Sequence, residues 1–159
     1  MLDDGSNFGW PYCYNDHLQG KKILAPEYGG DGKKVGRCEQ YERPIVAFSG
    51  HWAPNDLLFY TGNQFPASYQ NGAFIAFHGS WNRAPLEQAG YNIVFVPFDG
   101  ERPSGDWSVF ADGFAGVDVI RGPQDAQHRP MGLAQGPDGS LYVSDSVTGR
   151  IWCIRYTGK

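Results

Sequence analysis

Short apolar runs separated by turn residues dominate the chain after residue 43. Each run has four to six residues, is rich in β-branched and aromatic side chains, and is bounded by glycine, proline or asparagine. Such runs are typical of strands. The pattern predicts strands at 45–48, 57–60, 73–77, 91–96, 131–134, 141–144 and 150–155. Only 65–70 and 85–89 have room for a helical turn, and residues 1–43 are predicted to be a loop.

The predicted strands fall into two similar series. In both, a proline opens the first strand, the second strand ends in a polar residue, and a glycine precedes the third strand. The matching positions are Pro54 and Pro130, His78 and Asp145, and Gly90 and Gly149. Asp138-Gly139 supplies a tight turn within the second copy. Repeated units of three or four antiparallel strands are the blades of a β-propeller.

The strand pattern predicts an all-β fold, and the repeated units predict that this fold is a partial β-propeller. Because a blade takes roughly 40–45 residues, the chain has room for about two to three blades. We expect a leading loop segment that completes a preceding blade over 1–43, a blade over 44–116 and a last blade over 117–159. Propellers close with about four to eight blades. The ring is therefore expected to be completed by missing N-terminal blades or by self-association.

Composition narrows the functional classes. The 159 residues include 22 glycines and 11 prolines, which argues against a helical bundle. The net charge of −4 disfavours a nucleic acid or an anionic membrane as partner. No apolar run approaches the roughly 20 residues of a membrane span. Residues 1–5 have neither a basic start nor an apolar run, so no signal peptide is predicted within the sequence.

The three cysteines predict one disulfide. Cys13 and Cys38 lie in polar, glycine-rich segments, and a bond between them would close an otherwise poorly anchored loop. Cys153 lies in an apolar run and is expected to be a buried free thiol, although all three cysteines could also be reduced. No Cys-x-x-Cys pair is present, which disfavours a zinc site. If the disulfide forms, an exported protein, periplasmic or secreted, is expected.

Five motifs occur in an order that resembles one enzyme family. They are Asn-Phe-Gly-Trp-Pro-Tyr-Cys-Tyr at 7–14, His-Trp-Ala-Pro at 51–54, Phe-Tyr-Thr-Gly at 59–62, His-Gly-Ser-Trp-Asn-Arg at 78–83, and Arg-Pro at 129–130 followed by Pro-Asp-Gly-Ser-Leu-Tyr-Val-Ser-Asp at 137–145. Together they resemble the soluble glucose/sorbosone dehydrogenases that use pyrroloquinoline quinone (PQQ), and most closely the sorbosone and pyranose dehydrogenase-like branch. The resemblance covers the C-terminal half of a six-bladed propeller.

The resemblance implies a reaction and its cofactors. Members of the family oxidise a sugar by moving a hydride to PQQ, with the help of calcium, and pass electrons to an acceptor such as a cytochrome c. The family's histidine base and calcium loop precede the matched part. No catalytic residue and no metal ligand are therefore assigned in this sequence, and the isolated chain is expected to be inactive.

The resemblance also implies cofactor-binding residues. Arg129 matches a position where the family contacts PQQ with an arginine, and a guanidinium pairs well with a carboxylate. His78 and Arg83 flank a turn that supplies another cationic contact. The alternatives are an ion pair of Arg129 with an acid such as Asp125, and hydrogen bonding of His78 and Arg83 within their loop.

Two further histidines and two further functions complete the expectations. His51 and His128 each lie just upstream of a proline that opens a strand, where a structural role is favoured.

A non-catalytic propeller fragment or binding module, assembling with itself or with a partner, is the main alternative function. A lactonase-type propeller ranks last, because no matching set of Glu, Asn and Asp metal ligands is evident.

Overall fold

The computed structural model describes residues 4–16 and 18–158 and divides into two compact units, Met1–Phe48 and Ser49–Lys159. Each unit is described by itself. All strand pairs are antiparallel, and the described residues contain no α-helix, which confirms the all-β prediction. No helix within the described ranges has the length and hydropathy to cross a membrane. Most of the 1–5 segment lies outside the described residues.

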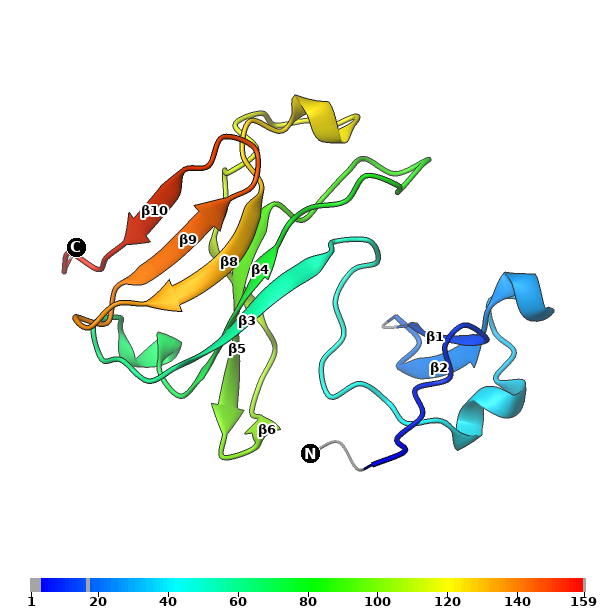
Figure 1. The fold of residues 1–159 in the computed structure, drawn as a ribbon. Helices are drawn as coiled ribbons and strands as arrows, with labels where there is room; N and C mark the ends of the chain where they lie inside the picture. Colours follow the sequence, from blue (N-terminus) through cyan, green and yellow to red (C-terminus); the bar gives the residue numbers. More distant parts are fainter. Residues whose placement is uncertain (1–3, 17, 159) are drawn as a thin grey trace. The chain divides into compact units, whose positions relative to one another are not determined.

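The first unit contains a short hairpin where a loop was predicted. Its elements are β1 (Cys13–Asp16), β2 (Lys21–Leu24) and the 3₁₀ helices η1 (Pro26–Tyr28) and η2 (Gly36–Gln40), drawn in blue to cyan in Figure 1. The loop prediction was wrong because these strands carry mostly polar residues. The disulfide joins β1 to η2 rather than to β2, and Ile23 and Leu24 of β2 are buried.

The Cys13–Cys38 disulfide confirms the predicted pairing, with the two Cα atoms 5.8 Å apart. Both cysteines and Leu24 form the small apolar core of this unit. Lys22 is also buried, and its ammonium donates hydrogen bonds to the backbone carbonyls of Phe8 and Glu42. Burial is the main cause of the lowered pKa of Lys22.

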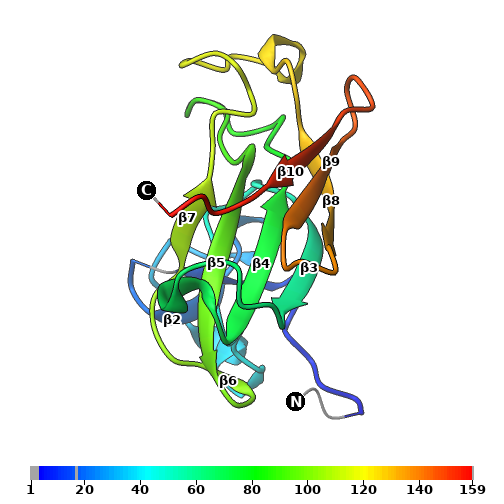
Figure 2. The same ribbon diagram turned by 90° about the vertical axis from the view of Figure 1, so that its left-hand side faces the viewer.

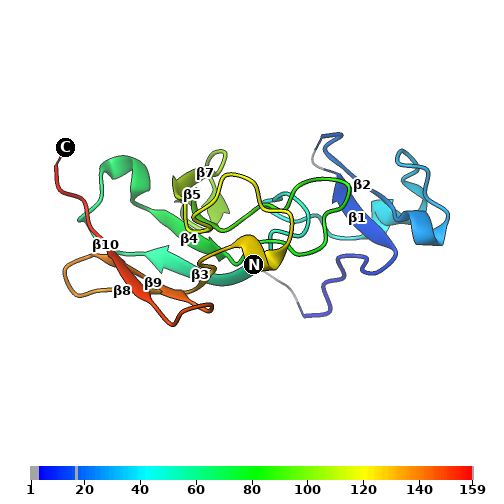
Figure 3. The same ribbon diagram turned by 90° about the horizontal axis from the view of Figure 1, so that it is seen from above.

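The second unit contains two antiparallel sheets. The first is built from β3 (Pro54–Tyr60), β4 (Gly72–Phe77), β5 (Asn92–Asp99), β6 (Arg102–Pro103) and β7 (Ser108–Ala111), and the second from β8 (Pro130–Gln135), β9 (Leu141–Asp145) and β10 (Ile151–Ile154). The 3₁₀ helices η3 (Ala67–Tyr69) and η4 (Pro123–Asp125) lie in the connections. Figure 2 shows β3, β4, β5 and β7 side by side, and Figure 3 shows β8, β9 and β10 as a separate group.

Six of the seven predicted strands are present, with small differences at their ends. The exception is 45–48, where the structure has no strand. The short strands β6 and β7 were not predicted. Of the two expected helical turns, 65–70 contains η3, whereas 85–89 has only a turn.

The internal repeat is visible in the order of the strands. The orders β3-β4-β5 and β8-β9-β10 are the same, and Pro54 and Pro130 begin the first strand of each set. Strands β3 and β8 are neighbours in both Figure 1 and Figure 3. A bulge in β8 frees the backbone N–H of Leu133, which donates to Asp56 Oδ2 at 2.7 Å. The assignment of these sheets to propeller blades, and the expected boundaries at 43 and 116, remain predictions.

Aromatic side chains fill the core that the two sheets share. The buried members are Tyr60, Phe65, Phe74, Ala76, Ile93, Phe95, Phe114, Leu141 and Val143. The hydroxyl of Tyr60 donates to the carbonyl of Gly139 at 2.8 Å, which ties the first sheet to the turn between β8 and β9. Burial of large aromatic side chains is the main source of stability here.

The prediction that Cys153 is buried was wrong, because its side chain is exposed. Successive side chains of a strand point to opposite faces. In β10, Trp152 and Ile154 pack against the shared core, so Ile151 and Cys153 face outward. An apolar run in the sequence does not show which of its alternate positions is covered.

Candidate functional site

Four chain segments meet at one end of the two sheets in the second unit. The start of β3 bonds the end of β4, where the N–H of His78 donates to the carbonyl of Ala53 at 2.9 Å. The start of β8 bonds the end of β9 in the same way, through Ser146 N–H and the carbonyl of Arg129 at 3.2 Å. We call this end, formed by residues 78–80, 128–129 and 145–148, the polar rim.

Arg129 joins the two sheets at the polar rim. Its Nε donates to the carbonyl of His78 at 3.0 Å, and its Nη2 donates to the carbonyl of Gly79 at 2.8 Å. The guanidinium carbon lies 5.5 Å from the centre of the Tyr91 ring. Nη1 makes no hydrogen bond to any residue that the structure describes. The guanidinium is thus held by two carbonyls while the hydrogen-bonding capacity of Nη1 is not used within the described residues.

The alternative ion pair of Arg129 with Asp125 is not formed. Asp125 Oδ2 instead accepts the backbone N–H groups of Arg121 at 2.9 Å and Gly122 at 3.2 Å. Within the described part of the chain, no carboxylate forms an ion pair with Arg129. The positive charge of Arg129 is thus solvated by carbonyl dipoles rather than neutralised.

His78 lies beside Arg129 and is partly buried. Its Nε2 hydrogen-bonds with Ser146 Oγ at 2.7 Å, which again links the two sheets. Burial lowers the pKa of His78, and the positive charge of Arg129 lowers it further. Because an imidazole with a lowered pKa is neutral near pH 7, His78 acts at the rim as a hydrogen-bonding group and not as a cation.

The turn after β4 has a backbone that requires glycine. Gly79 has φ +92°, and a Cβ at this position would lie 2.4 Å from atoms of the Tyr91 ring. The hydroxyl of Tyr91 donates to the carbonyl of Ser80. Burial raises the pKa of Tyr91, so the hydroxyl stays protonated and keeps this bond. Tyr91 thereby anchors the backbone at Ser80, directly after the His78 and Gly79 carbonyls that receive Arg129.

Asp145 is the buried anion of the polar rim, and its side chain has no exposed surface. Its oxygens accept Arg129 N–H at 2.8 Å, Val147 N–H at 3.1 Å, Thr148 Oγ1 at 2.6 Å and His128 Nδ1 at 3.0 Å. Burial favours the neutral acid, but these hydrogen bonds outweigh it and hold the pKa of Asp145 well below its usual range. A permanent negative charge therefore fixes the start of β8.

The remaining predicted residues are placed differently. Arg83 lies on the loop between β4 and β5, where Nη1 donates to the carbonyl of Glu87 at 3.1 Å, and no hydrogen bond joins it to His78 or Arg129. His51 is exposed, with φ +66°. The structure thus brings His78 and Arg129 together with Asp145 and His128, but it does not bring Arg83 or His51 into that network.

Sequence reasoning did not find Ser146, which lies in the rim, or Tyr91, whose ring lies against Gly79 of the rim. Ser146 directly follows Asp145, which the repeat alignment identified as the polar residue at the end of a strand. The alignment therefore pointed to the residue next to Ser146. Tyr91 carried no signal, because its role depends on a positive φ of 60° and on the close approach of Gly79.

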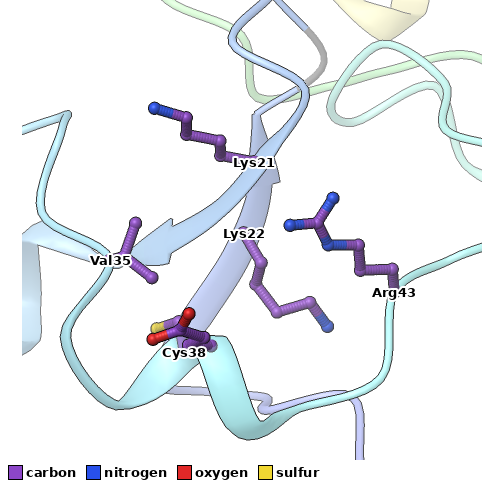
Figure 4. Close-up of a pocket in the computed structure, with 6 residues that line it drawn as sticks. Lys21, Lys22, Val35, Cys38 and Arg43 are labelled. Atoms are coloured by element: carbon purple, nitrogen blue, oxygen red, sulfur yellow. The ribbon is translucent and has the colours of Figure 1, made fainter.

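Each unit contains at least one cavity, and the one described for the second unit reaches His128 of the polar rim. In the first unit, a cavity of about 190 Å³ is lined by Lys21, Lys22, Val35, Cys38, Glu39 and Arg43; Figure 4 shows Lys21 and Lys22 directed away from each other. In the second unit, a cavity of about 470 Å³ runs along β10 and includes Phe114, Trp152 and Ile154. Among the described residues, no three His, Cys, Asp or Glu side chains are grouped to hold a metal ion.

Comparison with known proteins places the chain in a family. A family model described as TrAA12-like matches residues 2–157, almost the whole sequence. The chain belongs to the TrAA12-like family. Its relatives include a PQQ-dependent pyranose dehydrogenase of Coprinopsis cinerea, 29% identical over 92% of this chain but only 22% of that protein. An uncharacterized protein of Borreliella burgdorferi is 28% identical over 94% of this chain and 36% of its own length.

Solved structures give the same relationship for this TrAA12-like chain. The calcium structure of the Trichoderma reesei enzyme of carbohydrate-active family AA12 has a TM-score of 0.66 and 25% identity, covering 94% of this chain and 38% of that one. A glucose dehydrogenase has a TM-score of 0.58 at 19% identity, which shows a shared fold. The chain spans between about a fifth and two fifths of its relatives' lengths. The relationship to PQQ-dependent pyranose dehydrogenases is therefore confirmed.

Proposed function

We propose that this chain forms part of a PQQ-dependent sugar dehydrogenase, in which its two sheets are consecutive blades at the C-terminal end of a propeller. The support is the family match over residues 2–157 together with the same order of the first three strands in both sheets. In propellers, ligands bind where the ends of neighbouring blades meet. The polar rim occupies such a place between the two sheets.

Arg129 is the residue that carries the assignment. PQQ has three carboxylates, and a guanidinium edge that is already fixed by two carbonyls can bind one of them with little loss of conformational entropy. His78 supports this edge by presenting its own carbonyl to Nε. Arg83 is proposed as a second cationic contact from its loop.

When bound, PQQ supplies a two-electron acceptor for a hydride from the sugar, and calcium would polarise it from a site outside this chain. The residues described here would bind and orient the cofactor. Proton abstraction from the sugar is assigned to a part of the enzyme that this chain does not contain. We accordingly propose a sugar as substrate, a cytochrome c-like protein as acceptor, and an exported location, which the disulfide supports.

Equilibrium dialysis of PQQ against the chain, with calcium present, tests the assignment. Arg129→Ala should weaken binding on the order of tenfold or more, because a charge-assisted contact is lost. Arg102→Ala is the matched control, since Arg102 is an exposed arginine in β6, at the other end of β5. It should bind as the unmodified chain does.

Circular dichroism of each variant shows whether the fold is retained, which matters because Arg129 also binds two backbone carbonyls. Arg129→Lys keeps the positive charge but loses the planar guanidinium that can bind a carboxylate through two nitrogens. We therefore expect binding of intermediate strength. Dye reduction by the isolated chain with glucose or sorbosone should be absent. Equal PQQ binding by folded Arg129→Ala and Arg102→Ala would refute the assignment.

A non-catalytic binding module is the second candidate. It is favoured by the edge strand β10 with its outward Ile151, which leaves a surface for another polypeptide. PQQ binding that no rim substitution affects would favour this candidate.

A further inference from the structure

A second cavity of the second unit lies at the end of the first sheet that is opposite to the polar rim. Its volume is about 370 Å³, and its lining includes Phe59, Asn71, Gly72, Phe98, Asp99 and Gly100. The end of β3, the start of β4 and the end of β5 meet here, because Tyr60 pairs with Gly72 and Gly72 pairs with Pro97. The end of β5, beside β6, is at the bottom of Figure 2. The polar rim begins after Phe77, at the other end of β4 and roughly 20 Å away along the strand.

One wall of this cavity is an exposed aromatic ring. Successive side chains of a strand point to opposite faces, and Leu58 and Tyr60 of β3 pack into the core that the two sheets share. Phe59 therefore points to the other face of the sheet, where it is 57% exposed. The ring of Phe98 lies 5.2 Å from it in an edge-to-face contact. Because such a contact uses no more than one face of Phe59, at least one face of this ring is not used by Phe98.

Two polar side chains, Asp99 and Asn71, line the same cavity. Both are exposed, and neither forms a side-chain hydrogen bond or an ion pair with any residue that the structure describes. The backbone carbonyl of Asn71 accepts the N–H of Phe98 at 2.8 Å, which joins the two segments that carry them. A Cβ at Gly100 would meet no atom within 4 Å, so the turn after β5 leaves this side of the cavity open.

The lining indicates the class of ligand. Among the described residues that line the cavity none is basic, so an anion would meet the carboxylate of Asp99 and no positive charge. A carboxylate accepts hydrogen bonds, whereas a carboxamide both donates and accepts them. A ring that carries several hydroxyl groups satisfies both, and its C–H groups match the negative face of an aromatic ring. The volume lies near the lower end of the roughly 300–1,000 Å³ of small-molecule sites, which fits a single sugar ring.

We propose that this cavity binds one pyranose ring of a neutral saccharide. One face of the sugar packs against Phe59, its hydroxyl groups donate to the carboxylate of Asp99, and the side-chain amide of Asn71 donates to a sugar oxygen. Since the cavity is at the opposite end of the sheet from Arg129, it is a site that holds sugar and not the place of its oxidation. It is inferred from the lining of the cavity and does not rest on the proposed function.

An organic cation is the competing ligand, because an aromatic ring beside a carboxylate also attracts an ammonium group. Cations of this kind are typically enclosed by several aromatic faces. Here Phe59 is the exposed ring, whereas Phe98 is only partly exposed. The N–H groups of Asn71 would also find no acceptor on an ammonium group. The lining therefore favours a neutral sugar.

Titration of the full chain with D-glucose, followed by NMR of the backbone amides, tests the proposal without PQQ and without turnover. The amides of Gly72, Asp99 and Gly100 should shift and saturate, with a dissociation constant on the order of millimolar for a ligand of about a dozen non-hydrogen atoms. Sorbitol has similar hydroxyl groups but no ring face, and it should bind on the order of tenfold more weakly. Cellotriose titrated in parallel distinguishes a glycan from a free sugar as the source of the ring.

Matched variants locate the binding site. Phe59→Ala should weaken glucose binding on the order of tenfold, and Phe59→Tyr should preserve it. Leu57→Ala is the control, because Leu57 is exposed on the same face of β3 but does not line the cavity. Asp99→Ala should also weaken binding, whereas Asp106→Ala removes an exposed carboxylate outside the lining and should not. The dispersion of the amide signals shows that each variant is folded.

Four results would overturn the proposal. They are the absence of saturable shifts at the three amides, equal binding of glucose and sorbitol, saturable binding of choline but not of glucose, and glucose binding that neither Phe59→Ala nor Asp99→Ala weakens. Choline binding would identify the cavity as a cation site. Because the titration contains no PQQ and does not involve Arg129, PQQ dialysis can fail while glucose binding stands, and the reverse.

Discussion

The two units of this chain reach stability by different routes. In Met1–Phe48 the buried apolar side chains among the described residues are few: Ile23, Leu24 and the two bonded cysteines. In Ser49–Lys159 two sheets share a core of nine buried apolar side chains, with Phe74 and Phe95 among the least exposed. A segment with few apolar residues cannot exclude enough water to fold by burial alone. The covalent link compensates for that deficit in the first unit.

Each unit also buries one charged side chain, and the two charges are accommodated differently. Lys22 donates to backbone carbonyls, yet burial still lowers its pKa. Asp145 accepts N–H and O–H groups, which overcome burial and lower its pKa. Compared with the same side chains in water, the fold therefore disfavours the ionised form of Lys22 and favours the ionised form of Asp145.

Phe74→Ala should have the largest effect on the second unit. Phe74 is fully buried and its ring lies 4.6 Å from that of Phe110 and 5.0 Å from that of Phe95. Removing it should lower the free energy of unfolding by about 3–5 kcal/mol. Urea denaturation followed by circular dichroism measures this loss. Leu57→Ala, at an exposed position of β3, should change it by less than about 0.5 kcal/mol; similar losses for both would mean that the aromatic core is not the main source of stability.

Replacing both Cys13 and Cys38 with serine should have the next largest effect. The expected loss is about 2–4 kcal/mol, because the open chain regains conformational freedom. The loss should be confined to the first unit, so amides of β1 and β2 should exchange faster while those of β4 remain slow. Cys153→Ser is the control for the loss of a sulfur atom. Faster exchange in β4 would show that the two units do not unfold separately.

Apolar patterning explains which parts of the fold were predictable. The strands β3, β4, β5, β8, β9 and β10 follow apolar runs and were found, as was their repeated order. β1 and β2 were missed because each has four residues that do not alternate between polar and apolar, as Lys21 and Lys22 show. The run at 45–48 has a strand-like composition, but strand formation also requires a neighbouring strand.

The polar rim was predictable only in part. Aligning the two copies placed His78 after a second strand and Arg129 before a first strand, and these positions lie at the same end of antiparallel strands. The structure brings the two residues together. Sequence could not show that Arg129 binds carbonyls rather than Asp125, since that depends on the turn at Gly79. It also could not show that Arg83 points elsewhere, because loop geometry is not encoded in apolar periodicity.

Asp145→Asn should have an intermediate effect that depends on pH. At pH 7 we expect a loss of about 1–3 kcal/mol, because charge-assisted hydrogen bonds are weakened. The folded state keeps Asp145 ionised at a pH where the unfolded chain, with a carboxyl pKa of about 3.9, takes up a proton. The stabilisation is therefore complete above that pKa and decreases as the pH falls below it.

Denaturation curves between pH 7 and pH 2 measure this dependence. The difference between the unmodified chain and Asp145→Asn should shrink as the pH falls below about 4. Asp118→Asn is the control, since that carboxylate is exposed and forms no ion pair among the described residues. A difference that stays constant down to pH 2 would show that the charge of Asp145 does not stabilise the fold.

The three cysteines allow the finest comparison of the two units, with the smallest expected effect on stability. Cys153 is exposed on the outer face of β10, whereas Cys13 and Cys38 are buried and bonded. A thiol reagent should therefore label Cys153 alone in the folded chain, and Cys153→Ser should change the free energy of unfolding by less than about 0.5 kcal/mol. Mass spectrometry after labelling measures the outcome. If Cys153 reacted only after unfolding, the apolar run around it would be covered on both faces, and the alternation seen in β10 would be incorrect.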